Sequence, residues 1–590
     1  MLALPRPIVI AVLLALLLTA ALLPMFGGTY AIKFTTRVIV LAIFVISLDF
    51  LIGITGLVSF GHAMFFGLGA YVIYFVSPET SPTNALYAYP LAMLVAGLAA
   101  AMLGVVIVLT RGFYFIMVTL AFGQMMYSLF HDTRIAGGSD GAYVNVKPLV
   151  SLGGFTILDF EHRLSFYYFC IALLVLVYVT ALTLARGPLG RVLQGIRWNE
   201  TRTGALGFNT YTHKLVSFTI AGAIAGLAGA LFASIDGYVT PDLFGWKQSG
   251  FAIMMVVLGG AGTLFGPVLG AIVYNLLEEV FKTSSLVGPI ASHWQMALGF
   301  ILIGAVLLAP RGIAGLLDSM RADVEAKEQS SIPPPLEESP RDAQTIEVQG
   351  LSRRFGGLVA VDDVTLRLAP NRVHGIIGPN GAGKTTFINL LSGALRSSSG
   401  RILLDGEDVT DEPNYALARR GVGRSYQITN IFLPFTVREN CLLAAQAKHP
   451  SPLRLRSRAF ADESYAVARA LRATGLAHRE HTRAAHLSHG EQRQLEIAML
   501  IASGAKLLIL DEPLAGMGPE ETERVVALLR SLSIDHTIVL IEHDLDAIFG
   551  AADTLTVLVE GRVIAHGAPE DVRRDAAVRD AYLGSYGQAA

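Results

Sequence analysis

Residues 373–386 read VHGIIGPNGAGKTT, and this stretch decides the fold of the C-terminal half of the chain. The apolar run at 373–377 leads into G-x-x-x-x-G-K-[ST] and then into a helical pattern, the setting in which this motif is specific for a phosphate-binding P-loop. Its glycines allow the backbone to fold tightly and to point N–H groups at phosphates. A glycine-rich turn without function is the alternative, and the strand–loop–helix setting argues against it. The stretch therefore predicts an α/β domain that binds a nucleoside triphosphate.

The residues expected to hold ATP lie in and just after this loop. Lys384 would bring a positive charge to the β- and γ-phosphates, and the hydroxyl of Thr385 would be a ligand of Mg²⁺. We therefore predict ATP and Mg²⁺ as the cofactors of this half. The residues assigned to ATP are Gly378, Asn380, Gly381, Gly383, Lys384, Thr385 and Thr386.

A second apolar strand, KLLIL at 506–510, ends in the acidic pair Asp511-Glu512. Asp511 would lie beside the P-loop and hold Mg²⁺ through water. Glu512 would orient and deprotonate the water that attacks the γ-phosphate. Without the P-loop, a strand that ends in two carboxylates is more often a solvated turn; beside the P-loop, the pair is predicted to be catalytic.

The chain beyond residue 345 alternates β-type runs, such as KLLILDEP and HTIVLIEHD, with helical stretches. This alternation predicts an α/β domain with a mostly parallel sheet at 346–590. Residues 316–345 are rich in charge, serine and proline, which cannot build a core, so they are expected to be an exposed linker. Cys170 and Cys441 lie far apart and are expected to be structural thiols, since two cysteines make a disulfide framework improbable.

Residues 1–315 have an apolar texture. Across the chain 53% of residues are hydrophobic and 16% are charged, against roughly 25% charged in an ordinary globular domain. A helix needs about 20 apolar residues to cross a bilayer, so we predict an α-helical polytopic membrane domain with about ten spans. The eighth and ninth segments are short and glycine-rich, and broken or re-entrant helices are the alternative for them. The segments are 8–24, 38–54, 58–76, 90–110, 113–131, 164–184, 215–235, 248–262, 267–281 and 294–309.

The placement of lysine and arginine predicts the orientation of this domain. The polar loop 185–214 carries five of these residues and is predicted to be cytoplasmic. With ten spans, the N-terminus and the ATPase half fall on that same side, where ATP is available. The first 24 residues fit a cleavable signal peptide or a first span, and the lack of an A-x-A-like site favours a retained span. A net charge of −2 gives no reason to expect a nucleic-acid partner.

The C-terminal half resembles the ATP-binding cassette family from about Ile346 to Gly584. The family's signature, LSGGQ, corresponds here to LSHGE at 487–491, so its third and fifth positions depart from the pattern. In that family the signature contacts the γ-phosphate held by the P-loop of a partner subunit. The resemblance therefore assigns contacts with the partner's ATP to Ser488, His489, Gly490 and Glu491.

The same resemblance assigns three further residues to the ATP site. Gln427 matches the loop residue that contacts Mg²⁺ and water and links to the membrane domain. His543 matches the switch histidine at the γ-phosphate, and Phe355 matches the aromatic residue that stacks on adenine. A lone phenylalanine is more often a core residue, and a lone histidine or glutamine is usually on the surface; their order around the two firm motifs favours the site.

One position departs from the family in the loop that crosses the ATPase dimer. The family usually has aspartate or asparagine where this chain has Gly518. The side-chain contact with the partner site is therefore expected to be absent, and the two ATP sites of an assembled dimer are expected to be unequal.

The membrane half resembles the permeases of branched-chain amino acid importers over most of residues 30–315. The resemblance rests on GLVSFGHAMFFGLGAY at 56–71, VTLAFGQ at 118–124, GGSDG at 137–141 and VLGGAGTLFGPVLG at 257–270. The loop after residue 190 resembles the coupling segment that docks on the ATPase, with Glu200 and Gly207 as its marker residues; an ordinary amphipathic surface helix is the alternative. The sequence AYLG at 581–584 is similar to the ATPases of the same family.

This resemblance implies a larger assembly in a bacterial cytoplasmic membrane. The expected partners are a second permease and a second ATPase subunit, or a second copy of this chain, together with a periplasmic substrate-binding protein and the lipid membrane. Branched-chain amino acids are the leading cargo. Urea, short amides or aromatic acids are alternatives, as is a membrane-tethered regulatory ATPase that moves no cargo.

Three polar residues in the apolar half are candidates for a substrate path. A carboxylate at the centre of a span costs about 2.5–3.5 kcal/mol on insertion scales, so Asp49, in VISLDFLIG, is a functional candidate. A position near the cytoplasmic end, where the side chain reaches water or a helix cap, is the equally weighted alternative. His62 and Gln124 are the other two candidates for the substrate path.

Overall fold

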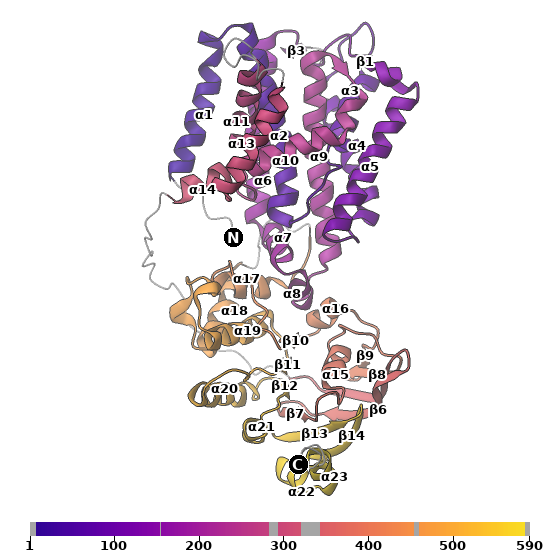
Figure 1. The fold of residues 1–590 in the computed structure, drawn as a ribbon, viewed down its shortest axis with the longest axis vertical. Coiled ribbons are helices and arrows are strands. Elements are labelled where there is room, and N and C mark those ends of the chain that lie inside the picture. The colour runs from indigo at the N-terminus through magenta and orange to yellow at the C-terminus, as the bar shows by residue number, and fades with distance from the viewer. Residues whose placement is uncertain (1–6, 154, 283–292, 320–342, 453–459, 584–590) are drawn as a thin grey trace.

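A computed structural model describes residues 7–153, 155–282, 293–319, 343–452 and 460–583 of the 590-residue chain. Figure 1 shows a bundle of helices at one end of the molecule and an α/β domain at the other. Two short helices, α7 (Pro188–Trp198) and α8 (Glu200–Ala205), project from the bundle towards the α/β domain, and the chain then returns into the bundle as α9 (Thr210–Asp236). The predicted order of an α-helical domain followed by an α/β domain is confirmed.

All ten predicted apolar segments overlap helices of the bundle. Their bounds are α1 (Pro7–Phe26), α2 (Thr29–Asp49), α3 (Ala63–Val76), α4 (Ala85–Ile107), α5 (Phe113–Asp132), α6 (Arg163–Arg186), α9 (Thr210–Asp236), α10 (Trp246–Gly259), α11 (Phe265–Lys282) and α13 (Trp294–Leu308). A π-helical turn, η1 (Phe50–Thr55), continues α2, and α14 (Gly312–Ser319) follows α13. Short strands and turns join helices elsewhere, including the hairpin β2 (Leu149–Leu152) and β3 (Phe155–Asp159).

The count of ten spans is not confirmed. Within the described residues, seven helices are long and apolar enough to cross a membrane. The other three segments fall short because α3 and α10 have only 14 residues each and α11 carries three charged residues near its end. The pair for which broken or re-entrant helices were the alternative forms two separate helices, α10 and α11, joined by a tight turn at residues 260–264.

Small residues let the helices of the bundle approach one another closely. A Cβ atom on Gly229 of α9 would overlap the carbonyl oxygen of Phe66 in α3, and one on Gly69 would overlap the carbonyl oxygen of Gly226. A Cβ on Gly61 would likewise meet the backbone of Thr119 in α5. At these three positions glycine is therefore required for close packing of the backbones.

The α/β domain contains two sheets. The six-stranded sheet has the order β10-β11-β12-β7-β13-β14, in which every neighbouring pair is parallel except β13–β14. The antiparallel sheet has the order β6-β5-β8-β9. The strands are β5 (Ile346–Phe355), β6 (Leu358–Leu368), β7 (Val373–Ile377), β8 (Ser399–Leu404), β9 (Glu407–Asp408), β10 (Val422–Arg424), β11 (Leu507–Asp511), β12 (Thr537–Ile541), β13 (Thr554–Val559) and β14 (Arg562–Gly567).

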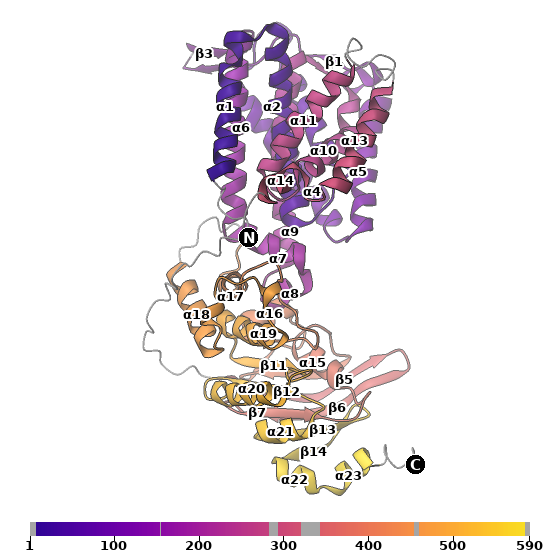
Figure 2. The same ribbon diagram turned by 60° about the vertical axis from the view of Figure 1, so that its left-hand side comes forward.

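Helices cover these sheets and reach towards the bundle. In Figure 2, α16 and α17 lie next to α7 and α8, with which they are in contact, whereas α22 and α23 lie at the far end of the domain. The helices are α15 (Lys384–Leu391), α16 (Asn414–Arg419), α17 (Val437–Gln446), α18 (Phe460–Ala473), α19 (His489–Ser503), α20 (Pro519–Leu532), α21 (Leu545–Ala551), α22 (Pro569–Arg574) and α23 (Ala576–Leu583).

Two further expectations concern the cysteines and the linker. Cys170 and Cys441 are both free and buried, as predicted. The predicted boundary after residue 315 falls inside α14, so helical structure runs four residues into the predicted linker, to Ser319. Residues 320–342 of that linker lie outside the described residues, and β5 begins at Ile346, the predicted start of the α/β domain.

The close contact between α3 and α9 gives a testable prediction. Gly229→Leu should markedly reduce the yield and lower the apparent melting temperature of the purified chain, because overpacking typically costs about 1–3 kcal/mol and backbone atoms cannot move aside. The yield and the apparent melting temperature are both measured by size-exclusion chromatography of samples heated to a series of temperatures. The matched control is Gly299→Leu in α13, where a Cβ meets no atom within 4 Å. Equal behaviour of the two variants would contradict the assignment.

Candidate functional site

The P-loop between β7 and α15 has the backbone that the sequence predicts. Gly381 and Gly383 adopt φ angles of +81° and +94°, which residues with a Cβ rarely adopt. A Cβ on Gly383 would also overlap the carbonyl oxygen of Ala360 on β6. The loop therefore depends on glycine for both its conformation and its close packing against the neighbouring strand.

Lys384 starts α15 and folds back over the loop. Its Nζ donates hydrogen bonds to the carbonyl oxygens of Gly378 at 2.5 Å and Pro379 at 3.0 Å. Partial burial lowers the pKa of Lys384, and the nearby carboxylates Glu512 and Asp511 oppose that shift. A partly desolvated cation thus lies at the loop that is expected to wrap the phosphates.

Asp511 and Glu512 lie at the carboxyl end of β11. Asp511 is almost fully buried, its backbone N–H donates to Ser425 Oγ at 3.1 Å, and burial raises the pKa of its carboxyl. Glu512 has a φ of +48°, an uncommon value for a residue other than glycine and one found where function requires strain. Its N–H donates to Ile541 O on β12 at 2.9 Å, which fixes the backbone as it leaves the sheet.

The three residues predicted to be catalytic meet at Glu512. Gln427 Nε2 donates to Glu512 Oε2 at 3.0 Å, and His543 Nδ1 lies 3.8 Å from Glu512 Oε1. These residues come from three separate segments of the chain. Their convergence is the arrangement expected of a group that positions an attacking water.

One cleft of about 670 Å³ connects this site with the helical domain. Thr385, Asp511 and Gln427 line it together with Trp198, the last residue of α7, and Asn199, which lies between α7 and α8. A hydroxyl, a carboxylate and an amide offer the oxygen ligands that Mg²⁺ prefers, so the residues predicted to hold Mg²⁺ fit that ion. The cleft brings a loop of the helical domain to the edge of the predicted metal site.

The remaining residues assigned to ATP surround the P-loop or lie at a strand end. Asn380 and Gly381 are exposed at the loop, and Thr386 is half-buried on the first turn of α15. Phe355 ends β5 and is 44% exposed, with the guanidinium of Arg353 4.7 Å above the ring. An exposed ring suits stacking, and the contact of Phe355 with adenine stays a prediction.

The signature residues begin α19. Ser488 Oγ accepts the N–H of Glu491 at 3.2 Å, and the Glu491 carboxylate accepts the N–H of Ser488 at 2.9 Å. This is a capping box, which explains why glutamate suits the fifth position although it departs from LSGGQ. Arg479 also donates to Glu491 at 3.0 Å, and its charge helps to lower the pKa of that carboxyl. His489 is exposed.

The signature and the P-loop line different hollows of the chain. Ser488, Gly490 and Glu491 line a cavity of about 220 Å³ with residues of α20, and no P-loop residue is among its lining residues. Gly518 precedes α20 and has no side chain to cap that helix. Its N–H donates to Glu521 Oε2 at 3.5 Å. The expectation that the signature serves a partner's ATP, and that Gly518 makes two sites unequal, stays a prediction.

The two residues predicted to mark the coupling segment have different roles. Gly207 O accepts a hydrogen bond from Arg419 Nε of the α/β domain at 2.9 Å. Glu200 instead pairs with Lys214 Nζ at 2.8 Å and lies 3.4 Å from Arg111, both within the helical domain. Gly207 therefore lies at the contact between domains, whereas Glu200 braces the segment from its own side.

Arg202 is buried at the contact between the domains, and the sequence did not reveal this role. Arg202 of α8 has no exposed surface, donates to Arg424 O at 2.7 Å, and lies 3.8 Å from Glu496 Oε1. Glu496 also accepts from the N–H of Tyr426 at 3.2 Å and pairs with Arg493 at 3.0 Å. In the sequence Arg202 counted only as one cytoplasmic charge, because its partners lie more than 200 residues away.

Glu542 is a second residue that the sequence did not reveal. It follows β12, is 2% exposed, and its Oε1 accepts the N–H of Leu514 at 2.7 Å. Ile541 and Glu542 thus hold the backbone on both sides of Pro513, which has no N–H of its own. Burial, together with the charges of Glu512 and Asp544, raises the pKa of Glu542 to about 7, against the opposing effects of Leu514 and His543. Glu542 therefore fixes the strained turn that carries Glu512.

The three candidates for a substrate path do not gather at one point. Both oxygens of Asp49 accept backbone N–H groups, from Gly262 at 2.7 Å and Leu264 at 3.1 Å. His62 is buried, with its Nε2 2.8 Å from Ser47 Oγ, whereas Gln124 is exposed on α5. A role of these residues in a substrate path stays a prediction.

Comparison with protein families gives three matches along the chain. Residues 30–309 match the model of the branched-chain amino acid transport system permease component. Residues 361–515 match the ABC transporter model, and residues 562–587 match the branched-chain amino acid ATP-binding cassette transporter model.

Individual relatives cover the α/β half. The high-affinity branched-chain amino acid transport ATP-binding protein BraF of Pseudomonas aeruginosa is 40% identical over 251 residues, which are 40% of this chain and 97% of that protein. LivG of Escherichia coli is 40% identical over 248 residues, again 40% of this chain and 97% of that protein. Among solved structures, an ATP-binding cassette of an ABC transporter in its ADP conformation is 27% identical, covers 41% of this chain and 99% of its own, and has a TM-score of 0.37.

The burial of Arg202 predicts the effect of its removal. Arg202→Ala should raise amide hydrogen exchange in α8 and at residues 424–427 by about tenfold or more, because truncating one partner of a buried charged contact costs about 2–5 kcal/mol. Mass spectrometry of the full chain measures this exchange. Arg367→Ala, which removes an exposed cation paired with Glu347, is the matched control. Unchanged exchange in the Arg202 variant would refute its docking role.

The raised pKa of Glu542 predicts a pH effect on stability. Because the pKa of about 7 in the folded chain exceeds the ordinary glutamate pKa of 4.5, this group stabilises the fold fully below pH 4.5, and that contribution is lost as pH rises through about 7. Glu542→Gln keeps an acceptor for Leu514 but cannot ionise. Its apparent melting temperature, relative to the parent chain, should therefore rise more at pH 8 than at pH 5.5.

The control for this experiment is an exposed glutamate in the same domain. Glu570 begins α22 and is exposed, so Glu570→Gln should show no such pH-dependent difference. A Glu542→Gln variant whose stability changes equally at both pH values would contradict the assignment.

Proposed function

Because this chain belongs to the branched-chain amino acid family of ATP-binding cassette transporters, with a permease domain and an ATPase domain in one polypeptide, we propose that it drives uptake of branched-chain or related amino acids with ATP. The observation that carries the proposal is the shared cleft. Trp198 and Asn199 of the permease domain line the same cavity as Thr385, Asp511 and Gln427 of the ATPase domain. A change in nucleotide state at this cleft has a direct route to the permease.

We infer a task for each residue of the ATPase site, and its geometry supports these tasks. Mg²⁺, held by Thr385, Asp511 and Gln427, would neutralise phosphate charge when ATP is bound. Lys384 binds the β- and γ-phosphates once it releases the P-loop carbonyls. Glu512 takes the proton of the attacking water.

The neighbours of Glu512 keep it in place for that step. Gln427 orients it through its amide, and the strained turn fixes its backbone because Ile541 and Glu542 hold both sides. His543 Nδ1 lies near the other carboxylate oxygen, where it can contact the γ-phosphate. Preorganised groups of this kind are the main contribution of a protein to phosphoryl transfer.

A complete transporter requires more than this chain in our proposal. The signature residues face a separate hollow, so a second ATPase domain, from another subunit or a second copy of this chain, would complete each ATP site. A second permease domain and a periplasmic binding protein would complete the path through a bacterial inner membrane. The relatives BraF and LivG are branched-chain amino acid transport proteins, which favours branched-chain amino acids over urea, short amides or aromatic acids.

Uptake into vesicles tests the proposal. Reconstituted vesicles that contain the chain with its partners, with the ATPase domain facing inwards and the binding protein outside, should accumulate leucine only when ATP is enclosed in them. Uptake of urea or an aromatic acid in place of leucine would reassign the cargo, and ATP hydrolysis without uptake of any candidate would favour a regulatory ATPase and refute import.

A variant of the catalytic base tests the mechanism. Glu512→Gln should lower kcat for ATP hydrolysis by about 100-fold or more, the usual contribution of a general base, while ATP binding persists. Glu520→Gln, an exposed glutamate at the start of α20, is the matched control and should hydrolyse ATP normally. Undiminished hydrolysis in the Glu512 variant would overturn the assignment of the base.

A further inference from the structure

Asp49 anchors a turn that lies far away in the sequence. The turn at residues 260–264 joins α10 to α11, and its Gly262 and Leu264 N–H groups donate to the two carboxylate oxygens of Asp49. Leu264 has a φ of +61°, a strained value for a leucine. Asp49 itself has no exposed surface. Its buried charge is therefore used to hold this turn in one conformation.

The backbone beside Asp49 is as closely packed as the turn. Gly53 lies in η1, the π-helical end of α2, and a Cβ on it would collide with Gly262 N and Asp49 Oδ1. A π-helical turn inside an α-helix is rare and frequently marks a functional position. The end of α2 and the 260–264 turn are thus in backbone-to-backbone contact, so one cannot shift without the other.

Arg197 connects this contact with the coupling segment. Its Nη1 donates to Gly53 O, and a Cβ on Gly262 would lie 2.8 Å from the same Nη1. Arg197 is the penultimate residue of α7. The guanidinium therefore touches both η1 and the 260–264 turn from the cytoplasmic side of the bundle.

The neighbours of Arg197 in sequence face the ATPase site. Trp198 and Asn199 line the cleft that contains Gln427 and Asp511, and Asn199 Nδ2 donates to Asn430 Oδ1 in the loop after Gln427. Three successive residues, 197–199, thus contact the membrane helices at one end and the nucleotide cleft at the other.

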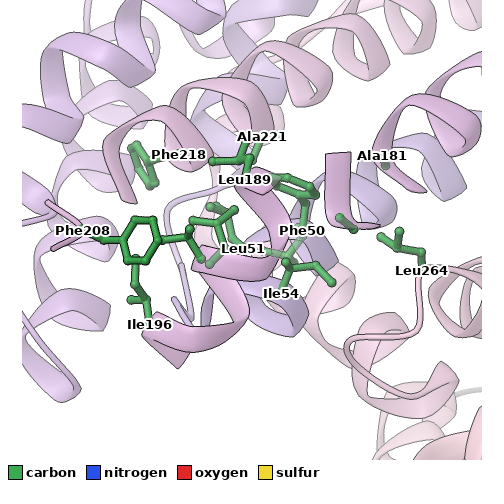
Figure 3. Packing of buried hydrophobic residues seen from close by; sticks show 14 of the residues in the cluster. Phe50, Leu51, Ile54, Ala181, Leu189, Ile196, Phe208, Phe218, Ala221 and Leu264 are labelled. Atoms are coloured by element: carbon green, nitrogen blue, oxygen red, sulfur yellow. The ribbon is translucent and has the colours of Figure 1, made fainter. Parts of the chain in front are cut away.

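Apolar packing makes this junction behave as one body. Figure 3 shows Phe50, Leu51 and Ile54 of η1 gathered with side chains from α7 and the 260–264 turn. Leu189, Ile196 and Leu264 are buried in this cluster. Because close-packed interiors transmit displacement rather than absorb it, a movement of α7 will carry η1 and the turn with it.

We propose that Arg197 is a positioning residue that transmits the nucleotide state of the Gln427 cleft to the 260–264 turn, with Asp49 as the anchor that holds the turn in register. This inference rests on the proposed function as an ATP-driven transporter. In this proposal Asp49 takes part in gating at the turn between α10 and α11, and it does not contact the cargo.

A fluorescent label on the turn tests this proposal. Ala261 is exposed on the turn, and the two native cysteines are buried, so bimane attached to Ala261→Cys reports on residues 260–264. The full chain with its partners in lipid nanodiscs should show a shift in bimane emission when Mg²⁺ and ATP are added. Arg197→Ala should reduce that shift by about fivefold or more, the lower range of typical allosteric coupling, while binding of a fluorescent ATP analogue is unchanged.

Two matched variants separate the transmitting role from a structural one. Arg197→Lys keeps a cation and a donor for Gly53 O, so it should retain most of the bimane shift. This variant tests the role of Arg197 even if Arg197→Ala reduces the yield of folded protein. Arg111→Ala removes an exposed arginine that lies 3.4 Å from Glu200 on the same segment, and should leave the shift unchanged.

The outcomes distinguish this inference from the proposed function. A full bimane shift in Arg197→Ala, or no shift in the labelled parent chain that binds ATP, would overturn the role of Arg197. A normal pattern of shifts in a chain that moves no cargo would leave Arg197 as the transmitter and refute import instead.

Discussion

The burial of the Arg202 side chain in the ATPase domain is the contact on which the rest of this structure depends. A guanidinium loses its water when it is buried, and that cost is offset only where hydrogen bonds and an opposite charge replace the water. Arg424 O and Glu496 supply these, and Arg493 and Tyr426 hold Glu496 in turn. The contact fixes α8 on the same segment that carries Gln427, so docking of the domains and the geometry of the nucleotide cleft are one problem.

The contact between α8 and the Gln427 segment is continued by hydrogen bonds in both directions, towards the nucleotide site and towards the membrane helices. Towards the nucleotide, Gln427 reaches Glu512, whose strained backbone is held between Ile541 and Glu542. Towards the membrane helices, Arg197 reaches η1 and the turn that Asp49 anchors. Buried polar groups appear at each step because hydrogen bonds, unlike apolar contacts, fix direction as well as distance.

The helical domain and the ATPase domain solve packing by different means. In the bundle, glycines remove side chains so that backbones touch, as between Gly229 and Phe66, because apolar burial contributes little between helices in lipid. In the ATPase domain, buried apolar strands such as β7, β11 and β12 form the centre of a parallel sheet. The residues that we propose to be catalytic follow the carboxyl ends of strands in this sheet, where ligands bind in open α/β sheets.

The sequence alone determined the P-loop, the acidic pair after β11, the order of the domains and the positions of the helices. These features depend on local patterns, such as glycine spacing and runs of apolar residues, which a single segment contains in full. The tertiary structure alone brought Arg202, Glu542 and Asp49 to their partners, and within the described residues it contains seven helices that are long and apolar enough to cross a membrane. Asp49 accepts a hydrogen bond from Gly262, 213 positions away. Whether a buried charge lines a substrate path, joins two domains or holds a turn depends on the partners that folding brings to it.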